Sequence, residues 1–179
     1  MRKFTQKLLM VLSVLIIIIS CSSDSDSLDS GDTSFKVKIN GEQFEATTIS
    51  SATILQSNGG QRFDITAEND EYKIIFAIAE TVQSQCMSNG DYVNDNSGRE
   101  VLIFIYYKIN GNNYLEHFPV EENNIQVSKA TVNSCSNGSI SGTFSVSLEK
   151  VGVLQNVIVT PDELELTEGE FNNIDFTIL

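Results

Sequence analysis

The feature that most constrains this chain is the alternation of apolar and polar residues from Phe35 almost to its end. Phe35, Val37 and Ile39 alternate with lysines, and the same period of two recurs at 63–67 and at 140–148. A period of two places successive side chains on opposite faces of a strand, whereas a helix repeats its apolar residues every three or four positions. Since no helical stripe is longer than two turns, the pattern predicts a chain built from strands.

One predicted strand differs from the others, because residues 100–109 are apolar on both faces. Val101 and Ile103 share one face, and Leu102 and Phe104 share the other. A strand with two apolar faces is normally buried on both sides. We therefore expect this strand to lie centrally, with cover on each face.

Asn and Gly residues mark the turns between roughly ten short strands, which recur at intervals of about 8–12 residues. Asn40-Gly41 and Asn110-Gly111 are strong hairpin signals. The pattern predicts an all-β sandwich or barrel, and of the two we expect a single antiparallel β-sandwich in residues 34–179. The less regular expected strands are 125–132, 153–159, 164–166 and 174–178, and short helices remain as alternatives only at 81–85 and 161–165.

The first 20 residues have the features of a targeting segment. Basic residues at positions 2, 3 and 7 precede an apolar run from Leu8 to Ile19. As a helix that run would be roughly 18 Å long, too short for the ~30 Å hydrocarbon core of a bilayer. A basic start followed by a short apolar run is typical of a secretory signal peptide, which we assign to residues 1–20.

The apolar run ends at Ile18-Ile19-Ser20-Cys21, which resembles the lipobox of bacterial lipoproteins. The resemblance implies cleavage before Cys21, which then becomes the first residue and is lipidated. Several acyl chains anchor a protein far more firmly than one. The alternative is an ordinary signal peptide cleaved near Ser20, with Cys21 incidental.

A flexible, disordered tether is predicted at residues 21–33, between the lipid and the sandwich. Residues 22–33 contain four Asp and one apolar residue, too little apolar surface to offset the entropy of ordering. Loss of residues 1–20 removes three of the 11 bases and none of the 24 acids, so the mature chain carries 8 bases and a net charge of −16. An acidic body is repelled by anionic membrane surfaces, so the lipid must provide the anchoring.

The acidic tract directly after Cys21 also bears on location. It resembles the surface-export signal of Bacteroidetes-type lipoproteins, which implies attachment to the cell outer membrane with the body facing outward. The alternative is a plain spacer on an outer-membrane lipoprotein that faces the periplasm.

The three cysteines have two different expected roles. With Cys21 assigned to lipid, Cys86 and Cys135 remain as an even pair in an oxidising compartment. Both lie in polar turns, and we expect a disulfide between them. The alternatives are two free thiols or a metal pair, although no His or further Cys lies near enough in sequence to complete a zinc site.

An oxygen-rich loop is a weak calcium candidate, because Ca²⁺ takes roughly six to eight oxygen ligands. The spacing does not fit an EF-hand, and Asn, Asp and Gly are common wherever a chain turns. We expect no other metal and no cofactor. The candidate ligands are Asp91, Asn94, Asp95, Asn96 and Glu100.

His117 is the only histidine, so no His-based metal cluster can form. It lies on the expected polar face of a strand, where a solvated or hydrogen-bonded side chain is the simplest interpretation. Aromatic residues close together in sequence suggest a binding platform, although on a two-faced strand they more often belong to the core. They are Tyr92, Tyr106, Tyr107, Tyr114 and Phe118.

The body also resembles a family of small Bacteroidetes-type lipoproteins that contain a domain of unknown function. The resemblance implies a single β-rich domain on a lipid anchor, and it brings no activity and no catalytic residues. The Cys86 and Cys135 pair is not part of the pattern. The matching segments are 35–41 with Phe44 and Ala46, 89–93, 140–146 and 164–174.

The net charge of −13 argues against a nucleic-acid partner, which would require Lys and Arg to displace counterions from phosphates. We expect a protein that is not an enzyme, a binding or display module whose ligand is a glycan or a protein. One alternative is a carboxylate-based hydrolase, which predicts at least two acidic side chains converging in a concave pocket. The other is a structural envelope lipoprotein without a ligand.

Overall fold

Three tight Asn-Gly turns join neighbouring strands in the computed structural model. In each turn both residues have a positive φ, between 50° and 54° at Asn and between 78° and 85° at Gly. This combination is the type I′ turn, whose twist matches that of the flanking strands. The turns at 40–41, 110–111 and 137–138 join β1 (Ser34–Ile39) to β2 (Glu42–Glu45), β7 (Arg99–Ile109) to β8 (Asn112–Leu115), and β12 (Ser128–Ser136) to β13 (Ser139–Lys150).

The structure describes residues 32–122, 125–126, 128–151 and 160–179. Within these ranges every regular element is a strand, which confirms the all-β prediction. None of the described residues belongs to a helix long and apolar enough to cross a membrane. The predicted signal peptide, Cys21, all but the last two residues of the predicted tether and the predicted strand at 153–159 lie outside the described residues.

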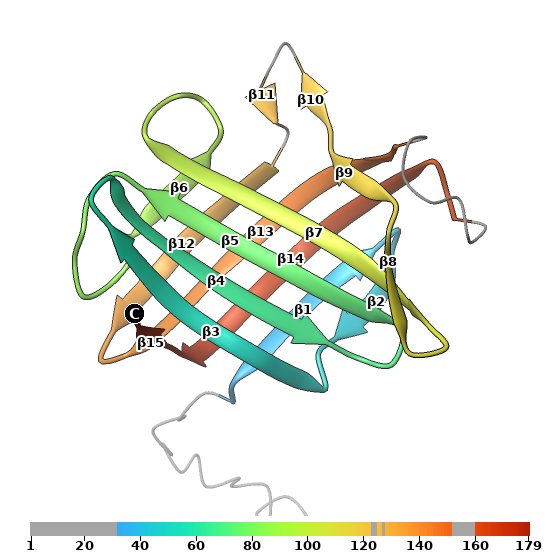
Figure 1. The fold of residues 1–179 in the computed structure, drawn as a ribbon, viewed down its shortest axis with the longest axis horizontal. Coiled ribbons are helices and arrows are strands. Elements are labelled where there is room, and N and C mark those ends of the chain that lie inside the picture. The colour runs from blue at the N-terminus through green and yellow to red at the C-terminus, as the bar shows by residue number, and fades with distance from the viewer. Residues whose placement is uncertain (1–31, 123–124, 127, 152–159) are drawn as a thin grey trace, which may run out of the picture. The chain divides into compact units, whose positions relative to one another are not determined.

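The other strands are β3 (Thr48–Ser57), β4 (Gly60–Glu68), β5 (Tyr72–Glu80), β6 (Gly90–Val93), β9 (His117–Pro119), β10 (Glu121–Glu122), β11 (Ile125–Gln126), β14 (Glu163–Asp175) and β15 (Thr177–Ile178). A seven-stranded sheet has the order β2-β1-β14-β13-β12-β6, with β9 pairing with β13. A six-stranded sheet has the order β15-β3-β4-β5-β7-β8. The two sheets pack face to face as a β-sandwich (Figure 1), and β10 and β11 form a separate pair.

Phenylalanine side chains fill the space between the two sheets. Phe76 of the six-stranded sheet contacts Phe144 and Phe171 of the other, with ring centroids 5.1 and 5.2 Å apart. All three are buried, and each buried aromatic side chain contributes about 1.5–3 kcal/mol. Gly142 leaves room for this packing, because a Cβ there would lie 2.4 Å from Phe171 Cζ and 2.3 Å from the Thr131 carbonyl oxygen.

The strand that is apolar on both faces is β7, and only one of its faces is in the core. Val101, Ile103 and Ile105 are buried, whereas Leu102 and Phe104 are half-buried on the outer face of the sheet. The expectation of cover on both faces is therefore wrong. In a sandwich of two layers the outer face of each sheet meets solvent, and β7 is one strand from the edge.

Several element boundaries also differ from the sequence-based expectations. Residues 81–85 form a loop and 161–165 lead into β14, so neither is helical. The strands expected at 164–166 and 174–178 become one long bulged strand, β14, followed by β15. The strand expected at 125–132 is divided between β11 and β12. β15 pairs with β3 in parallel, an exception in an otherwise antiparallel sandwich.

Candidate functional site

The outer face of the six-stranded sheet is divided into a polar half and an apolar half. On β4 the outward side chains include Arg62, Asp64 and Thr66. On β5 and β7 most of them are apolar, with the charged Lys73 and Glu100 near the strand ends. The apolar ones continue the second apolar face that distinguishes residues 100–109. These apolar residues are Ile75, Ala77, Ala79, Leu102 and Phe104.

The outer face of the seven-stranded sheet has a different character. Its exposed or half-exposed positions on β12 and β13 are polar: they include the hydroxyl side chains of Thr131, Thr143, Ser145 and Ser147 and the charged Lys129 and Glu149. An ordinary solvated sheet face has this composition, with polar residues alternating with the core. The apolar half of the six-stranded sheet is therefore the exceptional surface of the sandwich.

A hollow of about 420 Å³ lies on this surface, over the two alanines of β5. Arg62 pairs with Ala79 across β4 and β5, and Leu102 pairs with Ala77 across β5 and β7. Because alanine ends at a methyl group, the longer neighbours stand above it and enclose a space. We call this the alanine hollow; the residues that line it are Arg62, Ala77, Ile78, Ala79, Asn94, Asn96, Glu100, Val101 and Leu102.

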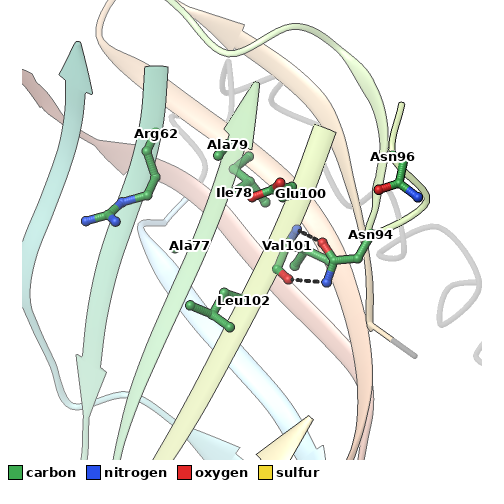
Figure 2. A pocket seen from close by; sticks show the side chains of 9 residues that line it. All are labelled: Arg62, Ala77, Ile78, Ala79, Asn94, Asn96, Glu100, Val101 and Leu102. Atoms are coloured by element: carbon green, nitrogen blue, oxygen red, sulfur yellow. Dashed lines mark hydrogen bonds between the residues drawn. The ribbon is translucent and has the colours of Figure 1, made fainter. Parts of the chain in front are cut away.

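The loop between β6 and β7 forms one wall of the alanine hollow (Figure 2). The Asn94 side chain donates a hydrogen bond to the Val101 carbonyl oxygen and accepts one from the Val101 N–H, both 2.9 Å long. Asp95 Oδ1 accepts a hydrogen bond of 2.9 Å from the Ser97 N–H. The two Asn94 bonds fasten the loop to β7, and the Asp95 bond holds the turn within the loop. The exposed Asn96, with a φ of 63°, lies at the rim of the hollow.

A second hollow of about 410 Å³ adjoins the first and shares Arg62 and Ala79 with it. It extends toward β3, where Leu55 and Ser57 line it. The two hollows therefore follow one another across the strands, on either side of the Arg62 side chain.

The five candidate calcium ligands do not converge on one point. Asp91 lies on β6 at the edge of the seven-stranded sheet, where it accepts a hydrogen bond of 2.7 Å from Thr131 Oγ1 and pairs with Lys129 Nζ at 3.0 Å on the neighbouring β12. These contacts with Thr131 and Lys129 lower the pKa of the Asp91 carboxyl. The side chains of Asn94 and Asp95 are hydrogen-bonded to Val101 and to the Ser97 N–H, as described above. Among the described residues, no group of three or more His, Cys, Asp or Glu could hold a metal ion.

A buried carboxylate organises the end of the sandwich next to the hollow. Glu80 is 5% exposed, and its Oε1 accepts hydrogen bonds from Gln61 Nε2 at 2.8 Å and the Ser88 N–H at 2.9 Å. Its Oε2 accepts one from the Tyr92 hydroxyl at 3.1 Å. Burial by itself raises the pKa of Glu80, but the hydrogen bonds from Ser88, Gln61 and Tyr92 together lower it below its usual value.

Cys86 and Cys135 form the predicted disulfide, with Cα atoms 5.7 Å apart and a sequence separation of 49. Gln61 Nε2 donates a hydrogen bond of 2.8 Å to the Cys86 carbonyl oxygen. Cys135 pairs with Ile140 in the β12–β13 hairpin. The bridge therefore ties the loop that connects the two sheets to a hairpin of the seven-stranded sheet.

His117 is fully buried, so its assignment to a polar strand face is wrong. β8 belongs to the six-stranded sheet and β9 to the other, so the alternation does not carry across from one strand to the next. The Nε2–H of His117 donates a hydrogen bond of 2.8 Å to the Pro161 carbonyl oxygen. Burial lowers the pKa of His117, outweighing the hydrogen bond to Pro161 and the nearby Glu116, which raise it.

The aromatic residues do not form a single platform. Tyr92 is completely buried, and Tyr107 packs against Tyr72 with ring centroids 5.4 Å apart. Phe118 packs edge-on against Phe104 at 5.7 Å, on the outer side of β7. The aromatic interpretation therefore applies only to this part of the outer face.

The residues that build the alanine hollow were not among the sequence-based candidates, apart from Asn94, Asn96 and Glu100. Arg62, Ala77, Ala79 and Leu102 come from three different strands, and nothing in their local sequence marks them. The one sequence feature that pointed to this surface was the second apolar face of residues 100–109, which predicted that this side of the strand is covered.

Comparisons with protein-family models, with curated proteins and with solved structures find no match for this chain. The fold and the site define an all-β sandwich that presents an open hollow of mixed polar and apolar lining on one sheet face.

Proposed function

We propose that this chain is a lipid-anchored protein of the outer membrane, displayed on the cell surface, which acts as a non-enzymatic binding module. The location rests on the sequence: the basic start, the short apolar run, Cys21 and the acidic tract after it. The observation that carries the binding role is the alanine hollow, about 420 Å³ in volume, which is open on a sheet face.

The construction of the alanine hollow supports this role. Its floor lies on β5, which is paired along both edges with β4 and β7. Its wall is fastened by the two Asn94 hydrogen bonds to Val101. A site held in this way loses little conformational entropy when a ligand binds, which favours affinity.

The hydrolase alternative requires two carboxylates that converge in a concave site. The alanine hollow contains one, Glu100. Glu168 and Glu170 line a different hollow, of about 380 Å³, on the seven-stranded sheet. Glu168 pairs with Lys38 at 2.6 Å, and its side chain is 67% exposed. A carboxyl group that protonates a leaving group is normally buried. The Glu168 and Glu170 hollow therefore supports a hydrolase less well than the alanine hollow supports a binding module.

The proposed anchor is tested by labelling cells with radioactive palmitate. We expect the label to enter the wild-type chain and not the Cys21→Ala variant, and we expect the variant to leave the membrane fraction. Protease added to intact cells should digest the domain if it faces outward. Complete protection in intact cells, with digestion after lysis, would contradict surface display.

The proposed binding role is tested with a photoreactive amino acid placed at Leu102, beside the hollow, or at Ser145, on the polar face of the other sheet. We expect adducts with added mass at position 102 in intact cells and none at position 145. Equal adducts at both positions, or none at either, would contradict a binding role for the hollow. Envelope defects on deletion, together with no adducts, would favour the structural alternative.

A further inference from the structure

We infer that the alanine hollow binds a neutral oligosaccharide, with the apolar face of a sugar ring against Ala77, Ala79 and Leu102 and its hydroxyl groups at Glu100 and Asn96. The inference rests on the proposed binding function and adds the chemical class of the ligand. It follows from the floor, the rim and the length of the site.

The floor of the hollow suits a flat, apolar surface of small area. The side chains of Ala77 and Ala79 lie two positions apart on the outer face of β5, Ala77 only 5% exposed and Ala79 half-buried, and Leu102 lies beside them on β7. A pyranose ring has a face of C–H groups of this kind, with its hydroxyl groups around the edge. The ring can therefore cover the alanines while its hydroxyl groups reach the rim.

The rim of the hollow carries groups that complement hydroxyls. Glu100 is exposed beside Ala79, its carboxylate only accepts hydrogen bonds, and the Asn96 amide both donates and accepts them. A hydroxyl group also donates and accepts, so neighbouring hydroxyls of one sugar can bond to both residues. The two side chains come from β7 and from the loop before it, which places them on the same side of the floor.

The charges around the hollow disfavour an acidic ligand. The Arg62 Nε donates a hydrogen bond of 2.8 Å to Asp64 Oδ2, so the nearest cation already has a counter-ion. Figure 2 shows the Arg62 guanidinium directed away from the alanines. Glu100 then leaves the hollow slightly negative, on a chain whose net charge is −13. An acidic sugar would be repelled, while a neutral one has no charge to be repelled.

The sheet also disfavours a peptide. The main-chain N–H and C=O groups of β5 are directed toward β4 and β7 in the ladders that form the floor. A peptide lying across these strands would find no free main-chain partner on the floor for its own N–H and C=O groups. A sugar needs only the side chains that the rim provides.

The length of the site indicates more than one sugar unit. The second hollow shares Arg62 and Ala79 with the first and reaches Leu55 on β3. From β3 to β7 the site crosses three strand spacings of about 4.8 Å, or roughly 14 Å. This exceeds the width of a single sugar ring, so an oligosaccharide fits the two hollows in line better than a monosaccharide.

The test uses the full lipoprotein in detergent micelles, labelled with ¹³C at its alanine methyl groups. The NMR probes are neutral hexasaccharides of glucose, mannose, xylose and galactose, together with hexagalacturonate, a chitosan hexamer and hexa-alanine. We expect at least one neutral hexasaccharide to shift the Ala77 and Ala79 methyl resonances in a saturable way. We expect the acidic, cationic and peptide probes to leave them unchanged.

Three variants make the result specific to the hollow. Ala79→Leu fills it and should weaken binding by at least about tenfold, whereas Ser145→Leu on the opposite face should leave the affinity unchanged. Glu100→Gln keeps a hydrogen-bond acceptor, so a neutral ligand should lose no more than about tenfold, while a cationic ligand would lose most of its affinity. Unaltered thermal unfolding shows that each variant folds.

Three results would overturn the inference. If no neutral hexasaccharide moves the two methyl resonances, or if Ala79→Leu binds as well as the wild type, the sugar is not held in this hollow. If only a charged probe or the peptide moves them, the ligand class is wrong although the binding function stands. The photoreactive experiment at Leu102 tests that function separately, since it detects an adduct of any class.

Discussion

Replacing both Cys86 and Cys135 with alanine removes a cross-link whose contribution can be worked out from the structure. The bridge joins residues 49 apart in sequence. In the chain-entropy model, closing a loop of that length lowers the entropy of the unfolded chain enough to stabilise the fold by about 4 kcal/mol. This is a large part of the roughly 5–15 kcal/mol that separates most native domains from their unfolded states.

The native state should survive the substitution, because other contacts hold both positions. The Cys86 carbonyl oxygen accepts the Gln61 hydrogen bond, and Cys135 stays paired with Ile140 in the hairpin. Removing the bridge should therefore act by raising the entropy of the unfolded chain, and the folded structure should change little. A folded domain of about 150 residues unfolds with an entropy of roughly 0.3 kcal/mol per kelvin, so a loss of about 4 kcal/mol lowers Tm by about 13 °C.

Circular dichroism on heating measures this shift in the wild type and in the double variant. Reduction of the wild type with dithiothreitol should lower Tm by a similar amount, and the reductant should have no effect on the double variant. A shift of less than about 4 °C, or a reductant effect that persists without the cysteines, would refute the chain-entropy reasoning.

The remaining predictions concern single side chains. The pKa of His117 is lowered on folding, so near that pKa the folded chain binds fewer protons than the unfolded chain. The urea midpoint of unfolding should therefore be highest above about pH 6.5 and fall as the pH decreases. A flat wild-type profile, or an equal slope in the His117→Gln variant, would contradict this. Glu80→Gln should lower the free energy of unfolding in urea by about 2–3 kcal/mol, because Glu80 is buried and hydrogen-bonded. The control Glu149→Gln, at an exposed position, should lower it by less than about 0.5 kcal/mol. Equal losses would argue against a stabilising role for the buried hydrogen bonds of Glu80. Gly142→Ala should cost about 2 kcal/mol by calorimetry, and Gly59→Ala, with open space around it, should be nearly neutral; a neutral Gly142→Ala would show that Phe171 can move aside.

The strands and several turns could be predicted because they depend on neighbours in the chain. Alternation at Phe35, Val37 and Ile39 requires only that successive residues of a strand face opposite sides. The Asn-Gly turns require only residues that tolerate a positive φ. The disulfide could be predicted by counting, once Cys21 was assigned to the lipid.

The candidate site could not be predicted in the same way. Asn94, Asp95 and Asn96 looked like ion ligands, because sequence shows oxygen atoms and does not show which of them are already bonded. In the structure the Asn94 amide is hydrogen-bonded to Val101, and the Asp91 carboxylate is bonded to Thr131 and Lys129 of the neighbouring strand β12. Turn formation and ion binding draw on the same residue types, and only the directions of the side chains distinguish them.

Local periodicity was enough to predict an all-β domain, because successive residues of a strand face opposite sides and the apolar ones alternate with polar ones. Which strands become neighbours is a property of the whole fold: β1 pairs with β14 from the far end of the chain, and β9 leaves the sheet of β8 and buries His117. The alanine hollow arises in the same way, since it exists only because the register sets Ala79 of β5 between Arg62 of β4 and Glu100 of β7. Pairing and register depend on contacts between residues far apart in sequence, and these contacts decided where the surface is hollow and which side chains surround it.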